Sequence, residues 1–204
     1  MKDRMQKAAI LEDVSGIGDN ALVSSYLEGD EQAFALLMTR YQDRLTNYLH
    51  GILRDYDRSI DLCQEAFIRV FKNAHRYKGQ YQFSTWLYRI ATNLAIDEIR
   101  RRQRRGQFFF SNVIGLFNRE ERPLPLPDTR HCPGKEFDRN ERRQKLQTAI
   151  DSLPEKYRLA FILKEAHELS YEETAQVLNI SLGTVKSRIH RAKLLLRGKL
   201  AELL

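Results

Sequence analysis

The chain has 204 residues, with 34 Lys and Arg against 27 Asp and Glu and a formal net charge of +7. That length holds one domain or two small ones, and the basic balance favours a polyanionic partner. Two cysteines cannot build a disulfide framework, and no signal-peptide pattern or membrane-length apolar run is present, so we expect a soluble cytoplasmic protein.

The first half of the chain has a helical pattern. Residues 1–18 are predicted to form a loosely ordered tail, and helical spacing then runs over 19–105. Asp30 is a candidate N-cap, and a second helix is expected over about 57–72. The polar and aromatic stretch AHRYKGQYQF is typical of a loop, and Ser84 is a plausible N-cap for the helix that follows.

Helical periodicity is lost over 106–135, where four prolines interrupt any regular element. We predict a flexible linker, whose apolar parts, including Phe108–Phe110, either dock on a partner or pack against one of the domains. Helices resume over 136–204. The predicted fold class is therefore all-α, with two small helical domains, 19–105 and 136–204, of which the second contains a helix-turn-helix.

The helix-turn-helix pattern spans residues 169–193. A capping box begins its first helix at Ser170, and Ser181 begins the second. Apolar residues recur on one side of the second helix: Val185, Ile189, Ala192 and Leu196. Cationic and hydroxyl side chains project from the other side, where they can reach phosphates and base edges: Lys186, Ser187, His190 and Arg191.

A second nucleic-acid pattern lies around the loop and helix after residue 75. The loop and the start of the helix interleave rings with cations: Arg76, Tyr77, Lys78, Tyr81 and Phe83. The helix then presents a separate stripe: Trp86, Arg89, Asn93 and Arg100. Rings stack on unpaired bases while cations follow phosphates, so this pattern favours single-stranded nucleic acid. Aromatic residues at helical spacing are also typical of a core, Trp86 in particular.

The predicted helix over 57–72 has an acidic outer face, on which Asp61, Gln64 and Glu65 lie together beside Lys72. Such a face suits a protein partner better than DNA; an ordinary solvated surface is the other reading. Its inward face contains Cys63, which we interpret as a small core residue.

Enzymatic and metal chemistry have little support. The pair His131–Cys132 could supply half of a metal site, but no second pair with zinc spacing is present. Glu165, His167 and Glu168 lie near one another without the H-E-x-x-H spacing, and no phosphate loop is present. We expect no metal, no cofactor, no small-molecule substrate and no catalytic activity.

Three blocks of the sequence together resemble a known family: DLCQEAFIRVFK, FSTWLYRIATNLAIDEIRR, and LPEKYRLAFILKEAHELSYEETAQVLNISLGTVKSRIHRAK. They are similar to the conserved blocks of extracytoplasmic-function (ECF) sigma factors, the small two-domain sigma subunits of bacterial RNA polymerase. The resemblance covers nearly the whole chain from Asp19, in the family's order. The long N-terminal tail and the Phe-rich linker depart from the family pattern.

The resemblance implies a role for each surface. Asp61, Gln64 and Glu65 match the helix that binds the β′ clamp helices of core RNA polymerase. The loop 76–83 matches the loop that captures a flipped base of the −10 element, and Asn93 matches a residue that reads the opened strand.

The remaining implied contacts concern the linker, the second domain and regulation. The linker is expected to thread through the polymerase. Lys186, Ser187, His190 and Arg191 match positions that read the −35 element as duplex DNA. Further implied partners are the polymerase β flap and an anti-sigma factor, often membrane-anchored.

An alternative is a conventional helix-turn-helix regulator with an N-terminal sensor domain. It would bind duplex DNA by itself as a dimer, and it would need neither the loop over 76–83 nor the acidic face.

Overall fold

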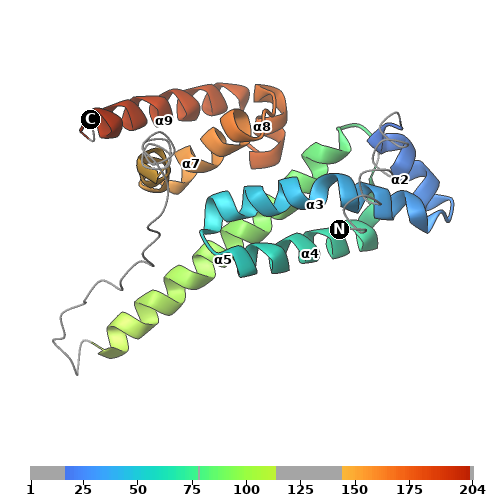
Figure 1. Cartoon of the computed structure of the whole chain (residues 1–204), viewed down its shortest axis with the longest axis horizontal. Coiled ribbons are helices and arrows are strands. Elements are labelled where there is room, and N and C mark those ends of the chain that lie inside the picture. The colour runs from blue at the N-terminus through green and yellow to red at the C-terminus, as the bar shows by residue number, and fades with distance from the viewer. Residues whose placement is uncertain (1–16, 78, 114–143, 203–204) are drawn as a thin grey trace, which may run out of the picture.

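The described part of the chain, residues 17–77, 79–113 and 144–202 of a computed structural model, consists of helices and turns without a β-strand (Figure 1). The predicted all-α fold class is therefore confirmed. The elements of the first half are α2 (Asp19–Leu27), α3 (Glu31–Leu53), α4 (Tyr56–Asn73), the short 3₁₀ turn η1 (Ala74–Arg76) and α5 (Phe83–Val113). Those of the second half are a helical segment over 144–151, α7 (Glu155–Phe161), the π-helical turn η2 (Ile162–Ala166), α8 (Tyr171–Leu178) and α9 (Leu182–Glu202).

Side-chain caps define where α3 and α4 begin. The carboxylate of Asp30 accepts a hydrogen bond from the Gln32 backbone N–H at 2.9 Å, which confirms the predicted N-cap. Asp55 caps α4 in the same way by accepting from Arg58 N–H at 3.0 Å. Each cap satisfies a backbone donor that the helix itself cannot pair.

Helix α5 differs from its predicted limits at both ends. It begins at Phe83, so Ser84 lies inside the first turn and is not the N-cap. It also continues through Gly106 to Val113, so the predicted linker begins later than residue 106. A glycine in a helix interior costs only about 1 kcal/mol relative to alanine, and Pro123 is the first residue after it that forbids a helix. The rest of the linker, with His131–Cys132, and the tail over 1–16 lie outside the described residues.

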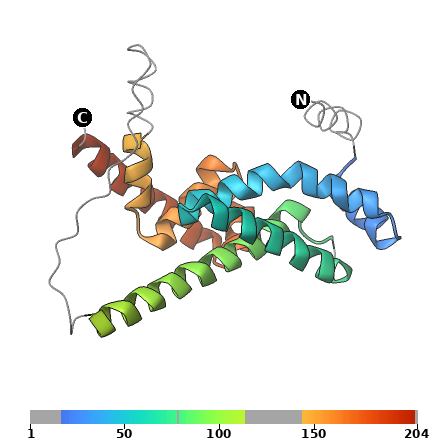
Figure 2. The same ribbon diagram turned by 60° about the horizontal axis from the view of Figure 1, so that its bottom comes forward.

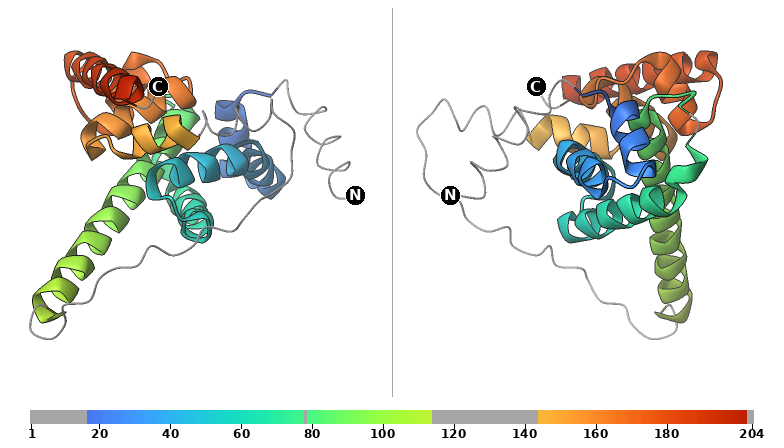
Figure 3. Two further views of the ribbon diagram at one scale, coloured as in Figure 1. Left: turned by 60° about the vertical axis from the view of Figure 1, so that its left-hand side comes forward. Right: turned by 90° about the vertical axis from the view of Figure 1, so that its right-hand side faces the viewer.

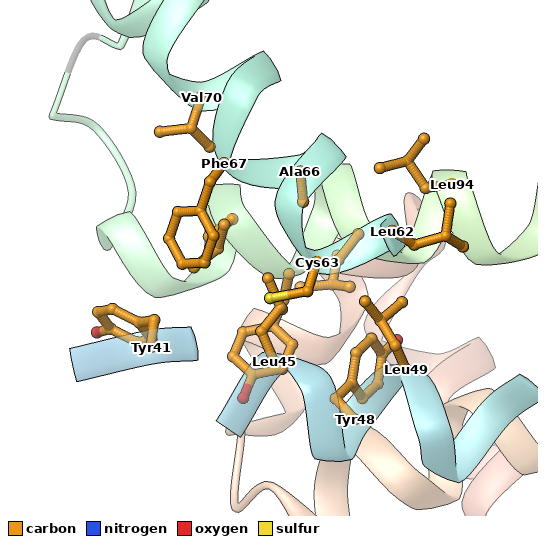
Figure 4. Packing of buried hydrophobic residues seen from close by; sticks show 14 of the residues in the cluster. Tyr41, Leu45, Tyr48, Leu49, Leu62, Cys63, Ala66, Phe67, Val70 and Leu94 are labelled. Carbon is orange, nitrogen blue, oxygen red and sulfur yellow. The ribbon is translucent and has the colours of Figure 1, made fainter. Parts of the chain in front are cut away.

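The core of the first half lies where α3, α4 and α5 meet (Figure 4). The packed side chains include Leu45, Tyr48 and Leu49 of α3 with Leu62, Cys63, Ala66, Phe67 and Val70 of α4 and Leu87, Ala91 and Leu94 of α5. Tyr48 is fully buried, and its hydroxyl lies 2.7 Å from Thr92 Oγ1, so burial leaves no unpaired hydroxyl there. Cys63 is buried, as expected of a core residue.

A cluster of charges joins α4 to α5. Glu98 of α5 is only 5% exposed, yet three guanidinium groups contact its carboxylate: Arg58 at 3.1 Å, Arg101 at 2.6 Å and Arg102 at 3.0 Å. Arg102 also reaches Asp55, the N-cap of α4, at 2.8 Å. The cluster therefore fixes the start of α4 against the middle of α5.

In the second half, α8 begins with the predicted capping box. Ser170 Oγ accepts from Glu173 N–H at 3.0 Å, and the Glu173 carboxylate accepts from Ser170 N–H at 2.7 Å. The helix ends at Asn179 in the left-handed conformation (φ 53°), which asparagine tolerates well. Buried side chains of α9 face α7 and the segment before it, among them Val185, Ile189, Ala192 and Leu196, as predicted.

The two halves of the molecule pack directly on each other. Helix α8 contacts α5, and η2 contacts α3 (Figures 2 and 3). Buried side chains of the second half, such as Leu163 and Val177, belong to the same apolar cluster as the core of the first half. The sequence did not indicate whether the two domains pack together or lie apart.

We expect Glu98→Gln to lower the free energy of unfolding of the first half by about 2 kcal/mol at pH 7, because charged hydrogen-bond partners lose their acceptor. Burial alone would raise the pKa of Glu98, but the hydrogen bonds from Arg101, Arg102 and Arg58 outweigh it and lower that pKa to about 2. The stabilisation is therefore complete above the ordinary pKa of 4.5 and is lost as the pH falls toward 2.

Trp86 is the sole tryptophan, so its fluorescence during urea unfolding monitors this half of the molecule. The difference between wild type and Glu98→Gln should shrink between pH 5 and pH 3. Glu65→Gln removes an exposed carboxylate paired with Arg69 on α4 and should change stability by less than about 0.5 kcal/mol. Equal effects of the two substitutions would contradict the role given to the buried cluster.

Candidate nucleic-acid interface

The free face of α9 carries the four predicted DNA-reading side chains. Lys186, Ser187, His190 and Arg191 are all exposed, on the side opposite the buried Val185 and its neighbours. Ser187 Oγ donates to the Thr184 carbonyl oxygen at 2.9 Å, and Lys186 Nζ lies 6.0 Å from the ring centre of Tyr171. The helix thus presents a basic surface that can enter a major groove.

The aromatic loop before α5 is held by Tyr77. The Tyr77 ring stacks on Trp86, with centroids 5.2 Å apart and planes at 29°. The Tyr77 hydroxyl lies 2.5 Å from Asn20 Oδ1 and 2.6 Å from the Tyr81 carbonyl oxygen. Tyr77 therefore fixes the loop to α2, and Asn20 is a supporting residue that its sequence context did not reveal.

The predicted stripe on α5 is mostly accessible. Arg89, Asn93 and Arg100 are exposed, while Trp86 is half-buried beneath Tyr77. In the loop, Arg76 is exposed and Tyr81 is 51% exposed. Lys78 lies outside the described residues. One edge of the helix thus offers an aromatic pair followed by cations and an amide.

Phe83 does not belong to this surface. Its side chain is fully buried and contacts the rings of Tyr41, Tyr77 and Trp86 at centroid distances of 5.5, 6.2 and 6.2 Å. The prediction that Phe83 contacts DNA is therefore corrected: as the first residue of α5 it points inward, and it supports the stacked pair from below.

The outer face of α4 contains Asp61 and Glu65, whose side chains are 63% and 41% exposed, and the exposed Gln64. Each carboxylate has a cationic neighbour on the same helix: Arg58 lies 3.4 Å from Asp61, and Arg69 lies 2.7 Å from Glu65.

Two large apolar side chains extend the same stripe of α4. Ile68 and Phe71 are 52% and 50% exposed. Their helical spacing from Asp61 and Gln64 is the sequence signal that places them on this face. Apolar residues next to charges on one exposed face are typical of a protein-binding surface.

Two of the three residues considered for enzymatic chemistry, His167 and Glu165, have structural contacts instead. His167 lies against Tyr48 and Tyr88, and burial, with a smaller effect of Arg44, lowers its pKa to about 4. Glu165 pairs with Lys193 at 2.9 Å. Among the described residues there is no group of His, Cys, Asp and Glu side chains that could hold a metal ion, and no helix long and apolar enough to cross a membrane.

Comparison with known families shows to which family the chain belongs. Residues 37–105 match the model of Sigma-70 region 2, and residues 143–196 match that of Sigma-70, region 4. The ECF RNA polymerase sigma factor SigW of Bacillus subtilis is 37% identical over 176 residues, which cover 86% of this chain and 93% of SigW. The chain belongs to the ECF family of RNA polymerase sigma factors.

A further relative and two solved structures are also similar to the chain. The ECF RNA polymerase sigma-E factor of Escherichia coli K12 is 35% identical over 190 residues, covering 91% of this chain and 96% of that protein. Among solved structures, CnrH in complex with the cytosolic domain of CnrY has a TM-score of 0.66 at 21% identity, covering 90% and 97% of the two chains. The sigma factor RpoE in complex with the anti-sigma factor NepR from Bartonella quintana has a TM-score of 0.61 at 23% identity, covering 82% and 96%.

Family membership settles the general character of this ECF sigma factor. Sigma factors bind RNA polymerase and promoter DNA and act in transcription initiation, and they are not enzymes. The individual contacts of each surface follow from the geometry and are proposed below.

We expect Phe83→Leu to lower the free energy of unfolding of the first half by about 1 kcal/mol, because it alters a fully packed site. Tyr81→Leu, at an exposed position two residues earlier, should stay within about 0.5 kcal/mol of wild type. Urea unfolding followed by circular dichroism and Trp86 fluorescence measures both. Equal stability of the two variants would contradict the inward position of Phe83.

Proposed function

We propose that this ECF sigma factor directs core RNA polymerase to promoters by reading duplex DNA at −35 with α9 and capturing the opened non-template strand at −10 with α5. The observation that carries the proposal is the Tyr77–Trp86 stack beside exposed Arg89 and Asn93. Double-stranded DNA offers no unstacked base to such a platform, whereas a melted −10 strand does.

The proposed recognition at −35 uses the exposed side of α9. Lys186 and Arg191 supply cations for phosphates and base acceptors, and Ser187 and His190 supply shorter polar groups between them. Helix α9 is one continuous element whose opposite side is buried, so these four groups keep a fixed spacing.

The α4 face is proposed to dock on the β′ clamp helices of the polymerase, and the second half to contact the β flap. The carboxylates of the α4 face suit a basic partner surface. Ile68 and Phe71 add exposed apolar area to the same face, which a face in contact with solvent alone would not need. The polymerase would then supply all of the chemistry.

We also propose control by an anti-sigma factor. The support is that one solved structure similar to this chain is the sigma factor RpoE in complex with the anti-sigma factor NepR, and that another, CnrH, is likewise in complex with a second protein, the cytosolic domain of CnrY.

A first test is run-off transcription with core RNA polymerase on genomic promoter fragments, with Asp61→Lys as the variant. Reversing the charge at the docking face should weaken core binding at least about tenfold, because opposed like charges cost several kcal/mol. Glu28→Lys reverses an exposed carboxylate outside this face and should bind core like wild type. Failure of the wild-type chain to stimulate any specific start site would refute the proposed function.

A second test separates the two DNA contacts. Asn93→Ala should reduce permanganate reactivity of the melted −10 strand about tenfold, through loss of a hydrogen bond to a base, and leave −35 protection unchanged. Lys186→Ala should instead weaken duplex binding and reduce its salt slope by about 1. Gln103→Ala, an exposed amide on another side of α5, is the control. The same loss of melting in all three variants would contradict the separate roles.

A further inference from the structure

The stacked aromatic pair, Tyr77 and Trp86, is attached to a helix that precedes the matched family region. Helix α2 spans Asp19–Leu27, whereas the match to Sigma-70 region 2 begins at residue 37. Two consecutive residues of its first turn reach different neighbours: Asp19 contacts α3, and Asn20 contacts the loop before α5. Successive residues of a helix point about 100° apart, so the start of α2 lies between these two elements.

The contact made by Asn20 depends on a hydroxyl that stacking does not require. The Tyr77 ring covers Trp86, and a phenylalanine ring would stack there equally well. The Tyr77 hydroxyl adds a donor that lies 2.5 Å from Asn20 Oδ1 and 2.6 Å from the Tyr81 carbonyl oxygen. Asn20 is exposed, so water could satisfy its amide without this contact. What the contact adds is a fixed position for the Tyr77 ring.

Asp19 fixes α2 itself. Its carboxylate accepts a hydrogen bond from the Tyr41 hydroxyl and pairs with the Arg40 guanidinium, both on α3. Arg40 Nη2 also donates to the Ile17 carbonyl oxygen at 3.1 Å. The N-cap of α2 is Gly18, which has no side chain to cap the helix. The contacts to α3 therefore hold the first turn of α2, and with it Asn20, in place.

Tyr41 continues this support to the stacked pair from the other side. Its ring centroid lies 5.5 Å from that of the buried Phe83, whose ring contacts Trp86. Burial and the hydrogen bond to Asp19 both raise the pKa of the Tyr41 hydroxyl, which therefore stays protonated and remains a donor. The first turn of α2 thus holds the pair from the Tyr77 side through Asn20 and from the Trp86 side through Asp19.

We propose that Asn20 is a positioning residue for capture of the −10 strand. It holds Tyr77 over Trp86, so that a stacking surface exists before the strand arrives; the proposal rests on the proposed function of the stacked pair. Gly79, in the loop after Tyr77, has a φ of 66° and gives that backbone more accessible conformations than another residue would. Without the contact to Asn20, the strand would have to order Tyr77 on binding, which lowers affinity.

The geometry can be tested in the free full-length protein, because Trp86 is its sole tryptophan. Asn20→Leu removes the acceptor and keeps a side chain of similar size, so it should increase the quenching of Trp86 fluorescence by acrylamide. Asn20→Asp keeps an oxygen at the same position and should protect Trp86 as the wild type does. Gln103→Leu makes the same change of an exposed amide on α5 and should leave the quenching unchanged.

A double-mutant cycle then separates positioning from a general structural role. The probe is the single-stranded non-template −10 strand of a promoter mapped by run-off transcription, bound by holoenzyme. Asn20→Leu should weaken this binding about fivefold, the factor that ordering one side chain costs. Tyr77→Phe keeps the ring, loses the hydroxyl and should cost at least as much. The double variant should bind no more weakly than Tyr77→Phe, because Asn20 acts only through that hydroxyl.

Additive losses in the double variant, or an unchanged strand affinity in Asn20→Leu, would overturn the proposal. Equal quenching of Trp86 in Asn20→Leu and wild type would also overturn it, as would equal exposure of Trp86 in Asn20→Asp and Asn20→Leu. Failure of the proposed function has a different outcome. Wild-type holoenzyme would then select no promoter, while the quenching of Trp86 in free Asn20→Leu would still report whether Asn20 holds Tyr77.

Discussion

The division of α5 into a buried face and an exposed edge is the constraint on which the other surfaces depend. Leu87, Ala91 and Leu94 fix the helix in the core, so Arg89 and Asn93 can point only outward. Because the same helix carries Glu98, whose guanidinium partners include Arg58 of α4, the exposed edge of α5 and the outer face of α4 keep a fixed relation to each other. Under the proposed function, this relation lets a polymerase docked on α4 set the position of the residues proposed to capture the strand.

Much of this could be predicted from the sequence. Helical periodicity predicted the core faces of α4 and α9, and local capping patterns predicted the starts of α3 and α8, because these features depend on residues within a few positions of each other. The position of Phe83 could not be read in the same way. A ring at the first turn of a helix faces inward or outward according to partners such as Tyr41, which is distant in sequence.

The contact between the halves was beyond sequence reasoning for a similar reason. Ile162 meets Gly51 across more than one hundred residues, and no periodic pattern marks either position as belonging to an interface. Helix α5 extends past Gly106 to Val113 because a single glycine weakens a helix without ending it, so Gly106 alone does not mark the helix boundary.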